Sequence, residues 1–202
     1  MKQGDDRLKW EKLCIGYTSE AKDYNVKDFF MKQLQVAGGA ASVEAMKNYL
    51  GDRDLCAPAI AVIKAVGGQN AEEILAGALK DEKNPCTSTI LNILADWKSS
   101  RAVIEYQKLA LSGDINVKAA AYRALAASGS PEAYKILTDA ARSVNYRWEH
   151  SGATEALLLY AINTGEKGNL KTADKICKTL LKSCNDRSNI QYKTEALQKS
   201  LT

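Results

Sequence analysis

The sequence has little proline, a single histidine and no long apolar run. Its three prolines among 202 residues leave long segments free to form helix, and the frequent Ala, Leu, Lys and Glu favour helix over sheet. Because no run of about 18 apolar residues occurs, no membrane span is predicted. The opening residues, Met1 to Asp6, lack the apolar core of a secretory signal. We therefore expect a soluble, cytoplasmic chain, or a periplasmic or secreted one if it is a processed or excised fragment.

Cysteine is present, but its arrangement does not indicate a disulfide framework. The five cysteines are an odd number, and none stands in a Cys-x-x-Cys pair. Free, mostly buried thiols are expected at all five positions, which are Cys14, Cys56, Cys86, Cys177 and Cys184. The second histidine that a common metal site would use is missing, so neither a metal nor a cofactor is predicted.

The sequence repeats with a period of about 30 residues. An aliphatic anchor stands four positions before a glycine at Leu34, Ile63 and Leu125, and Leu94 fills the gap with Lys98 in place of glycine. The anchors are 29, 31 and 31 residues apart. Each anchor is expected near the end of a first helix. The glycine pairs at 38–39 and 67–68 are expected to end such helices in the left-handed conformation.

A second helix is predicted to follow each anchor. The predicted capping residues of these helices are Ser42, Asn70, Ser100 and Ser130, because such side chains cap helix N-termini. They are spaced by 28, 30 and 30 residues. Asn70 and Glu73 have the spacing of a capping box, and Pro131 suits the first helical position. Each unit is therefore predicted to be a helix, a tight turn and a second helix.

The fifth unit departs from this period. Thr-Glu-Ala-Leu occurs at residues 154–157 and again at residues 194–197, which is an interval of 40. If Leu157 is the anchor, Gly165 follows it by eight residues instead of four. The first helix of this unit is therefore predicted to be about one turn longer than the others.

One unit resembles a known repeat closely. The segment Asp114 to Leu137 resembles a HEAT repeat of the short bacterial kind, with Asp114, Val117, Ala120 or Ala121, Leu125 and Gly129 at the expected offsets. The resemblance implies an all-α, right-handed α-α superhelix of the armadillo-like type, with about five helix pairs plus capping helices. It also implies a non-catalytic scaffold that binds a protein on its concave surface.

A fainter resemblance concerns residues 32–39 and 54–59, which are similar to HEAT regions of large secreted bacterial proteins, some of them fused to sugar-active domains. It implies an accessory module of a larger exported protein. A single solenoid domain over 1–202 is expected, and its predicted parts are a cap at 1–24, repeats at 25–54, 55–85, 86–114, 115–146 and 147–187, and a further repeat or cap at 188–202.

Basic residues give the clearest candidate for a binding surface. Five lysines are spaced by 4, 4, 3 and 4 residues, and we expect them to form one stripe along the second helix of the fifth unit. They are Lys167, Lys171, Lys175, Lys178 and Lys182. Such a stripe could bind phosphates, acidic glycans or an acidic protein, although an ordinary solvated helix face has the same pattern.

Aromatic residues and the histidine complete the candidates. Tyr106 and Tyr134 are expected on second helices, where they either pack in the core or anchor a partner. His150, beside Glu149 and Trp148, is expected at a helix start. A hydrolase or lyase centred on His150 is an alternative, but adjacent helical residues point about 100° apart, so Glu149 is poorly placed to orient it.

Nucleic-acid binding in the manner of DNA-glycosylase-like HEAT proteins is a second alternative. It would need basic residues along the second helices. The predicted second helices instead carry acidic residues, which are Glu44, Glu72, Glu73, Glu105 and Glu132. A protein partner is therefore preferred.

Overall fold

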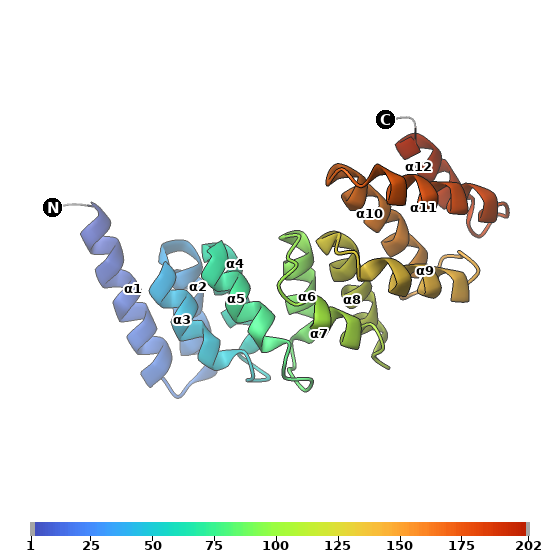
Figure 1. Cartoon of the computed structure of the whole chain (residues 1–202). Coiled ribbons are helices and arrows are strands. Elements are labelled where there is room, and N and C mark those ends of the chain that lie inside the picture. The colour runs from blue at the N-terminus through green and yellow to red at the C-terminus, as the bar shows by residue number, and fades with distance from the viewer. Residues whose placement is uncertain (1–2, 201–202) are drawn as a thin grey trace. The chain divides into compact units, whose positions relative to one another are not determined.

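The computed structural model describes residues 3–200, with side chains from residue 5 to residue 196. Every regular element in residues 3–200 is a helix (Figure 1), so the predicted all-α class is confirmed. The chain divides into two compact units, residues 1–90 and 91–202. The ends of the predicted domain, at residues 1–2 and 201–202, and the side chain of Leu197 lie outside the described part.

The first unit contains a single N-terminal helix followed by helix pairs. Its helices are α1 (Gln3–Glu20), α2 (Tyr24–Ala37), α3 (Ala40–Met46), the short 3-10 helix η1 (Lys47–Tyr49), α4 (Cys56–Val66) and α5 (Gly68–Ala78). Helix α1 packs mainly on α2 and also contacts α3. Helix α4 packs on α2 and α3. Met31, Leu34 and Ile63 are fully buried in the core between these helices. The boundary between the units falls within α6 (Thr87–Asp96).

The second unit continues the pairing of helices. It contains α7 (Val103–Leu109), α8 (Ile115–Ser128), α9 (Ala133–Ser143), α10 (Ala153–Glu166), α11 (Leu170–Ser183) and α12 (Ile190–Ser200). Helix α10 is central, because it packs on α8, α9 and α11. Leu125, Leu157 and Leu180 are buried in this core. The first helices of the pairs are thus α2, α4, α6, α8 and α10, and the second helices are α3, α5, α7, α9 and α11.

The predicted capping residues of the second helices are wrong. Ser42 and Asn70 are the third residues of α3 and α5. Ser100 and Ser130 lie in turns three residues before α7 and α9 begin, and Pro131 precedes its helix too. The residues that directly precede these four helices make no side-chain capping bond. Local capping chemistry therefore does not set where these helices begin.

In the first unit, α1 supplies the missing caps. The buried carboxylate of Glu11 accepts hydrogen bonds from the amide of Gly39 (2.7 Å) and from the amide and hydroxyl of Ser42 (3.0 and 2.7 Å). Arg7 donates to the carbonyl oxygen of Gly38 (3.0 Å), just after the end of α2. Burial would raise the pKa of Glu11, but these hydrogen bonds and the charge of Arg7 together hold its pKa below the ordinary value. A neighbouring helix thus satisfies both the end of α2 and the start of α3.

The turns that end the first helices adopt different conformations. Gly129 is left-handed, with φ of 58°, and Gly67 has φ of 68°. Gly38 has φ of −68° and ψ of 161°, so the predicted left-handed conformation is wrong there. Lys98 occupies the position of the missing glycine and nevertheless has φ of 51°. Lys98 therefore has a positive φ although its side chain does not favour that conformation.

The predicted lengthening of the fifth unit's first helix is also wrong. Both α10 and α8 contain 14 residues. Leu34, Ile63 and Leu125 each stand three residues before the last residue of their helix, and in α10 that place belongs to Asn163, not to Leu157. The 40-residue interval between residues 154 and 194 lengthens outside α10, and α11 contributes to it with 14 residues against 11 in α9.

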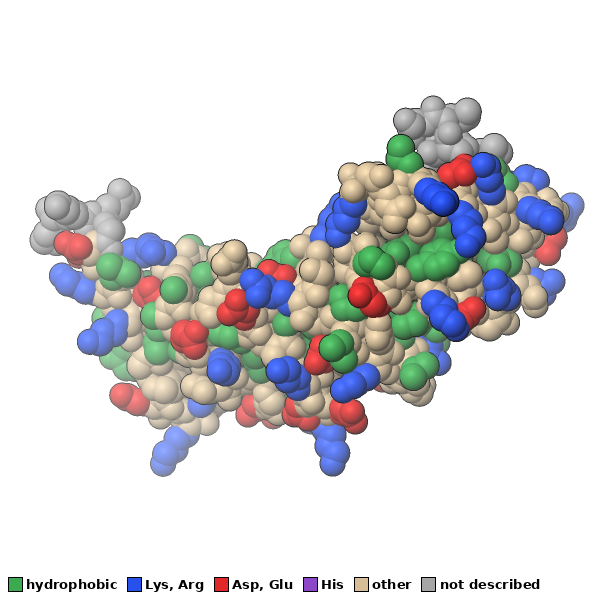
Figure 2. Space-filling view, in the orientation of Figure 1, with side chains coloured by type: hydrophobic (Ala, Val, Ile, Leu, Met, Phe, Trp, Pro, Cys, Tyr) green, Lys and Arg blue, Asp and Glu red, His purple; other side chains and the backbone are tan. Residues whose placement is uncertain are grey.

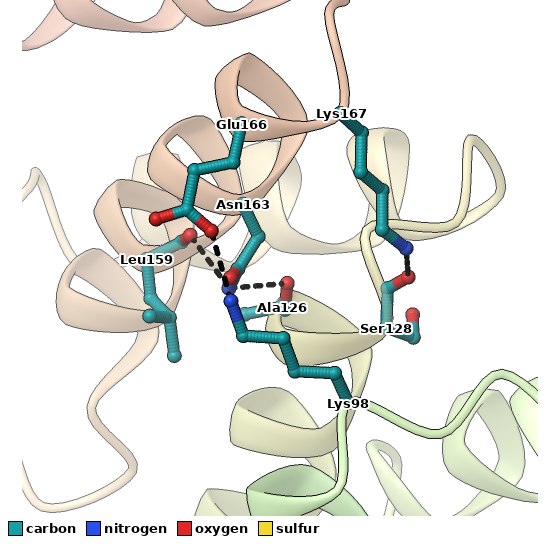
Figure 3. A network of polar contacts seen from close by, with 7 residues as sticks. All are labelled: Lys98, Ala126, Ser128, Leu159, Asn163, Glu166 and Lys167. Carbon is teal, nitrogen blue, oxygen red and sulfur yellow. Dashed lines mark hydrogen bonds and ion pairs between the residues drawn. The ribbon is translucent and has the colours of Figure 1, made fainter.

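Asn163 belongs to a set of polar contacts that join helix ends in the second unit (Figure 3). Its amide group donates to the carbonyl oxygens of Ala126 (3.2 Å) and Leu159 (3.1 Å). The ammonium group of Lys167 donates to the carbonyl oxygen of Ser128. Side chains from the end of α10 therefore satisfy carbonyl groups at the end of α8.

Two of the five cysteines are joined, so the expectation of five free thiols is wrong. Cys56 and Cys86 form a disulfide with a Cα–Cα distance of 6.2 Å, and both lie in the first unit. They are 30 residues apart in the sequence, which is one repeat; Cys56 is the first residue of α4, and Cys86 directly precedes α6. The repeat itself brings them together, and sequence spacing alone does not reveal such a pairing. Cys14, Cys177 and Cys184 are free and buried, as expected.

Candidate partner-binding surface

Four of the five predicted lysines form an exposed row on α11. The opposite face of α11 is buried through Ile176, Cys177 and Leu180, and this anchors the helix against its neighbours. The row borders a shallow hollow on the helix surface, and Lys and Arg side chains gather over α11 in Figure 2. Its members are Lys171, Lys175, Lys178 and Lys182.

Two members of this row have local partners. The Lys178 ammonium lies 2.7 Å from the Asp174 carboxylate, one helical turn away. The Lys175 ammonium lies 5.3 Å from the centre of the Tyr134 ring on α9, within the range of a cation–π contact. The row is thus tied to α9 at one point while its lysines remain exposed.

Lys167 does not belong to this row. It follows the last residue of α10, before α11 begins, and its ammonium group is bound to the carbonyl oxygen of Ser128 (Figure 3). The even spacing in the sequence continues across a turn between two helices, and the turn separates Lys167 from the others. The charge of Lys167 instead lies at the C-terminal end of α8, where a cation is favourable.

The two candidate tyrosines differ in accessibility. Tyr106 on α7 is 0% exposed, and its hydroxyl lies 3.4 Å from the carbonyl oxygen of Ser99. It is therefore a core residue and offers no surface to a partner. Tyr134 is half-buried, with its ring 6.5 Å from that of Tyr160 and beneath Lys175. Only Tyr134 can contribute to a binding surface.

His150 lies in an exposed turn before α10, as predicted. Its ring makes an edge contact with that of Trp148, at 5.1 Å. Glu149 instead caps α10, because its carboxylate accepts from the amides of Ser151 (2.7 Å) and Ala153 (2.9 Å). Burial acts to raise the pKa of Glu149, but these hydrogen bonds lower it overall. The carboxylate beside His150 thus has a structural role.

Sequence reasoning missed a groove in the first unit. It runs between the second helices α3 and α5, has a volume of about 570 Å³ and is lined by both acidic and basic side chains. Its floor includes Leu50 and Ile74, which are 4% and 9% exposed. Acidic side chains lie over α3 and α5 in Figure 2. The small residues of α5, Gly77 and Ala78, were the signal in the sequence, since they leave room between the helices.

No described group of three or more His, Cys, Asp or Glu side chains could hold a metal ion. None of the helices within residues 3–200 is long and apolar enough to cross a membrane.

Comparison with known proteins identifies the repeat. Residues 71–158 match the family model of HEAT repeats, a range that includes α7, α8 and α9 and the segment Asp114 to Leu137. No curated protein matches the sequence significantly. HEAT repeats generally mediate protein–protein interaction or scaffolding, and the fold is typically non-catalytic. The resemblance to HEAT repeats is thus confirmed over residues 71–158.

Proposed function

We propose that this chain is a non-catalytic binding module that holds an acidic segment of a partner protein on its second-helix surface. The observation that supports this most directly is the exposed lysine row of α11 (Lys171, Lys175, Lys178 and Lys182). Exposed ion pairs contribute only about 0.2–1 kcal/mol each, so useful affinity requires several at once. A row along one helix offers several.

The spacing of the row favours a helical partner. Lys171 and Lys182 are 11 residues apart, which is about 16 Å at 1.5 Å per residue. Carboxylates spaced by three and four residues on a second helix repeat at the same pitch, so the two rows can align. The four basic positions are all lysines, without the arginine forks that favour bidentate phosphate binding.

A labelled helical peptide with glutamates at every fourth position tests this proposal. We expect saturable binding that weakens at high salt, since screening acts over about 8 Å at physiological ionic strength. The double substitution Lys171→Glu and Lys182→Glu should weaken binding at least tenfold. Lys135→Glu on α9, at a side chain 86% exposed, is the matched control and should have little effect. Equal binding by both variants, or tighter binding of duplex DNA to the same row, would contradict the proposal.

We further propose that the module acts in an oxidising compartment, as part of an exported protein. The Cys56–Cys86 disulfide supports this, because structural disulfides persist outside the reducing cytosol. The test is to unfold the protein without reductant, alkylate its free thiols and count the labels by mass spectrometry. Three labelled thiols are expected. Labelling of five thiols in protein taken from its own cell would contradict the proposed compartment.

A further inference from the structure

The groove between α3 and α5 contains two positions that are open without a packing reason inside the chain. A Cβ atom built on Gly51 or on Gly77 would have no atom within 4 Å. Gly77 lies in the last turn of α5, and glycine is less favourable than alanine in a helix. Both positions therefore leave the backbone of the groove open to close approach from outside.

The lining of the groove is amphipathic. Leu50 and Ile74 form an almost buried apolar floor. Charged groups surround it, and three carboxylates outnumber two ammonium groups. They are Glu44, Glu73 and Asp81, with Lys47 and Lys80. The groove therefore favours a ligand with apolar groups for the floor and positive charge for the rim.

One of these carboxylates is held in place from across the groove. The Glu44 carboxylate on α3 accepts a hydrogen bond of 2.8 Å from the side-chain amide of Asn70 on α5. This contact joins the two walls at one end and fixes the direction of the carboxylate. A carboxylate already positioned in this way binds a cation with less loss of side-chain freedom.

The length of the groove limits what can occupy it. Along α5 its lining runs from Asn70 to Ala78, which is about 12 Å at 1.5 Å per residue, and it continues past the end of the helix to Asp81. An extended peptide rises about 3.3 Å per residue, so about five residues span the groove. The contact of its backbone with Gly77 would be close, because no side chain stands between them.

We propose that the α3–α5 groove binds an extended peptide of about five residues with a lysine or arginine side chain directed to Glu44. The proposal rests on the protein-binding function given above but uses a different surface, in the other unit. The groove can therefore fail as a site while the lysine row of α11 still binds its acidic partner, and the reverse is equally possible.

Two pentapeptides of opposite charge test the groove on the full chain. One is acetyl-Ala-Leu-Arg-Leu-Ala-amide, and the other carries Glu in place of Arg. Each peptide is titrated into the protein while the backbone amide chemical shifts are recorded. Only the arginine peptide should cause saturable changes at Gly51, Asn70 and Gly77. Glu44→Gln should weaken this binding roughly tenfold, as expected for loss of a charged hydrogen bond. Equal shifts with both peptides, or none with either, would overturn the proposal.

A substitution that fills the groove separates binding from folding. Gly77→Leu places a side chain in open space and improves helix propensity, so it should abolish binding without lowering the unfolding midpoint. Gly16→Leu on α1 is the matched control, because Gly16 is also helical and has no atom within 4 Å of its Cβ position. Binding by the Gly77→Leu variant at the wild-type level would show that the peptide lies elsewhere.

Discussion

The ammonium group of Lys98 lies 2.8 Å from the carboxylate of Glu166, and this ion pair joins the end of α6 to the end of α10 (Figure 3). Lys98 reaches Glu166 from a left-handed backbone conformation, with φ of 51°. Both side chains are more than half exposed, so the pair itself contributes little. The backbone strain at Lys98 has the larger effect on stability, and it lowers the free energy of unfolding.

Replacing Lys98 should separate these two contributions. Lys98→Ala and Lys98→Gly both remove the ion pair, but only glycine relieves the left-handed conformation, which costs other residues roughly 1–2 kcal/mol. We expect the glycine variant to be more stable than the alanine variant by about 1 kcal/mol in urea unfolding. Equal stability of the two variants would show that the backbone at this turn relaxes.

Gly129→Ala should destabilise the second unit by more than its backbone conformation alone requires. The new Cβ would lie 3.1 Å from the Lys167 side chain and would displace the ammonium group that binds the carbonyl of Ser128. Gly168→Ala is the control, because Gly168 also has a positive φ, of 88°, but has open space around it. Thermal unfolding should show a lower midpoint for Gly129→Ala than for Gly168→Ala. If the two midpoints are the same, the contact with Lys167 is unimportant.

Glu11→Gln should destabilise the protein at neutral pH by about 1–3 kcal/mol, the usual range for hydrogen bonds to a buried charged group. The folded-state pKa of Glu11 is lowered, so its contribution is complete above the unfolded value, near 4.5, and is lost as the pH falls through the folded value. Unfolding free energies of wild type and variant, measured from pH 7 down to pH 3, should therefore converge at low pH. A difference that does not change with pH would contradict a charged Glu11.

Asn163→Leu should destabilise the protein even though it restores the aliphatic residue of the other repeats. The variant loses the two hydrogen bonds that the Asn163 amide donates, to the carbonyls of Ala126 and Leu159. The amide of Gly129 still donates to Ala126 (3.3 Å), so we expect a loss of about 1 kcal/mol, the usual net value of a hydrogen bond. Chemical denaturation measures the difference, and Leu125→Asn in α8 provides the reciprocal comparison. A gain in stability for Asn163→Leu would mean that the apolar contacts of leucine outweigh these hydrogen bonds.

Reduction of the Cys56–Cys86 disulfide should lower stability by roughly 3–4 kcal/mol, the value expected for a closed loop of 30 residues. Unfolding of the oxidised protein, with and without reductant, gives the effect directly. The variant Cys86→Ser should match the reduced protein and should not respond to reductant. A response of that variant would implicate one of the three free cysteines.

The features that the sequence predicted well are those that depend on the apolar period. Leu34, Ile63 and Leu125 are buried at equivalent places, because only stacking of neighbouring pairs removes their side chains from water. The capping residues were predicted poorly, since the groups that satisfy the helix ends come from other helices. Glu11 lies 28 residues before the amide it caps at Gly39, and no local spacing rule contains such a pair.

The candidate sites also differ in whether they depend on spacing within one helix or on contacts between helices. The lysines of α11 lie on one helix, so helical spacing grouped four of them correctly, and it failed only where Lys167 falls beyond the turn. The α3–α5 groove depends on two helices meeting side by side around small residues. The periodic pattern gives the order of those helices but not the space that Gly51 and Gly77 leave open.

The covalent link from α4 to α6 has a mechanical consequence. Tension along the chain cannot extend the 30 residues between Cys56 and Cys86, because the load passes through the sulfur–sulfur bond. In a pulling experiment, the oxidised protein should reach a shorter final length than the reduced protein, by the contour of that segment. A repeat array usually gives way one unit at a time, and here one unit is shielded from the force.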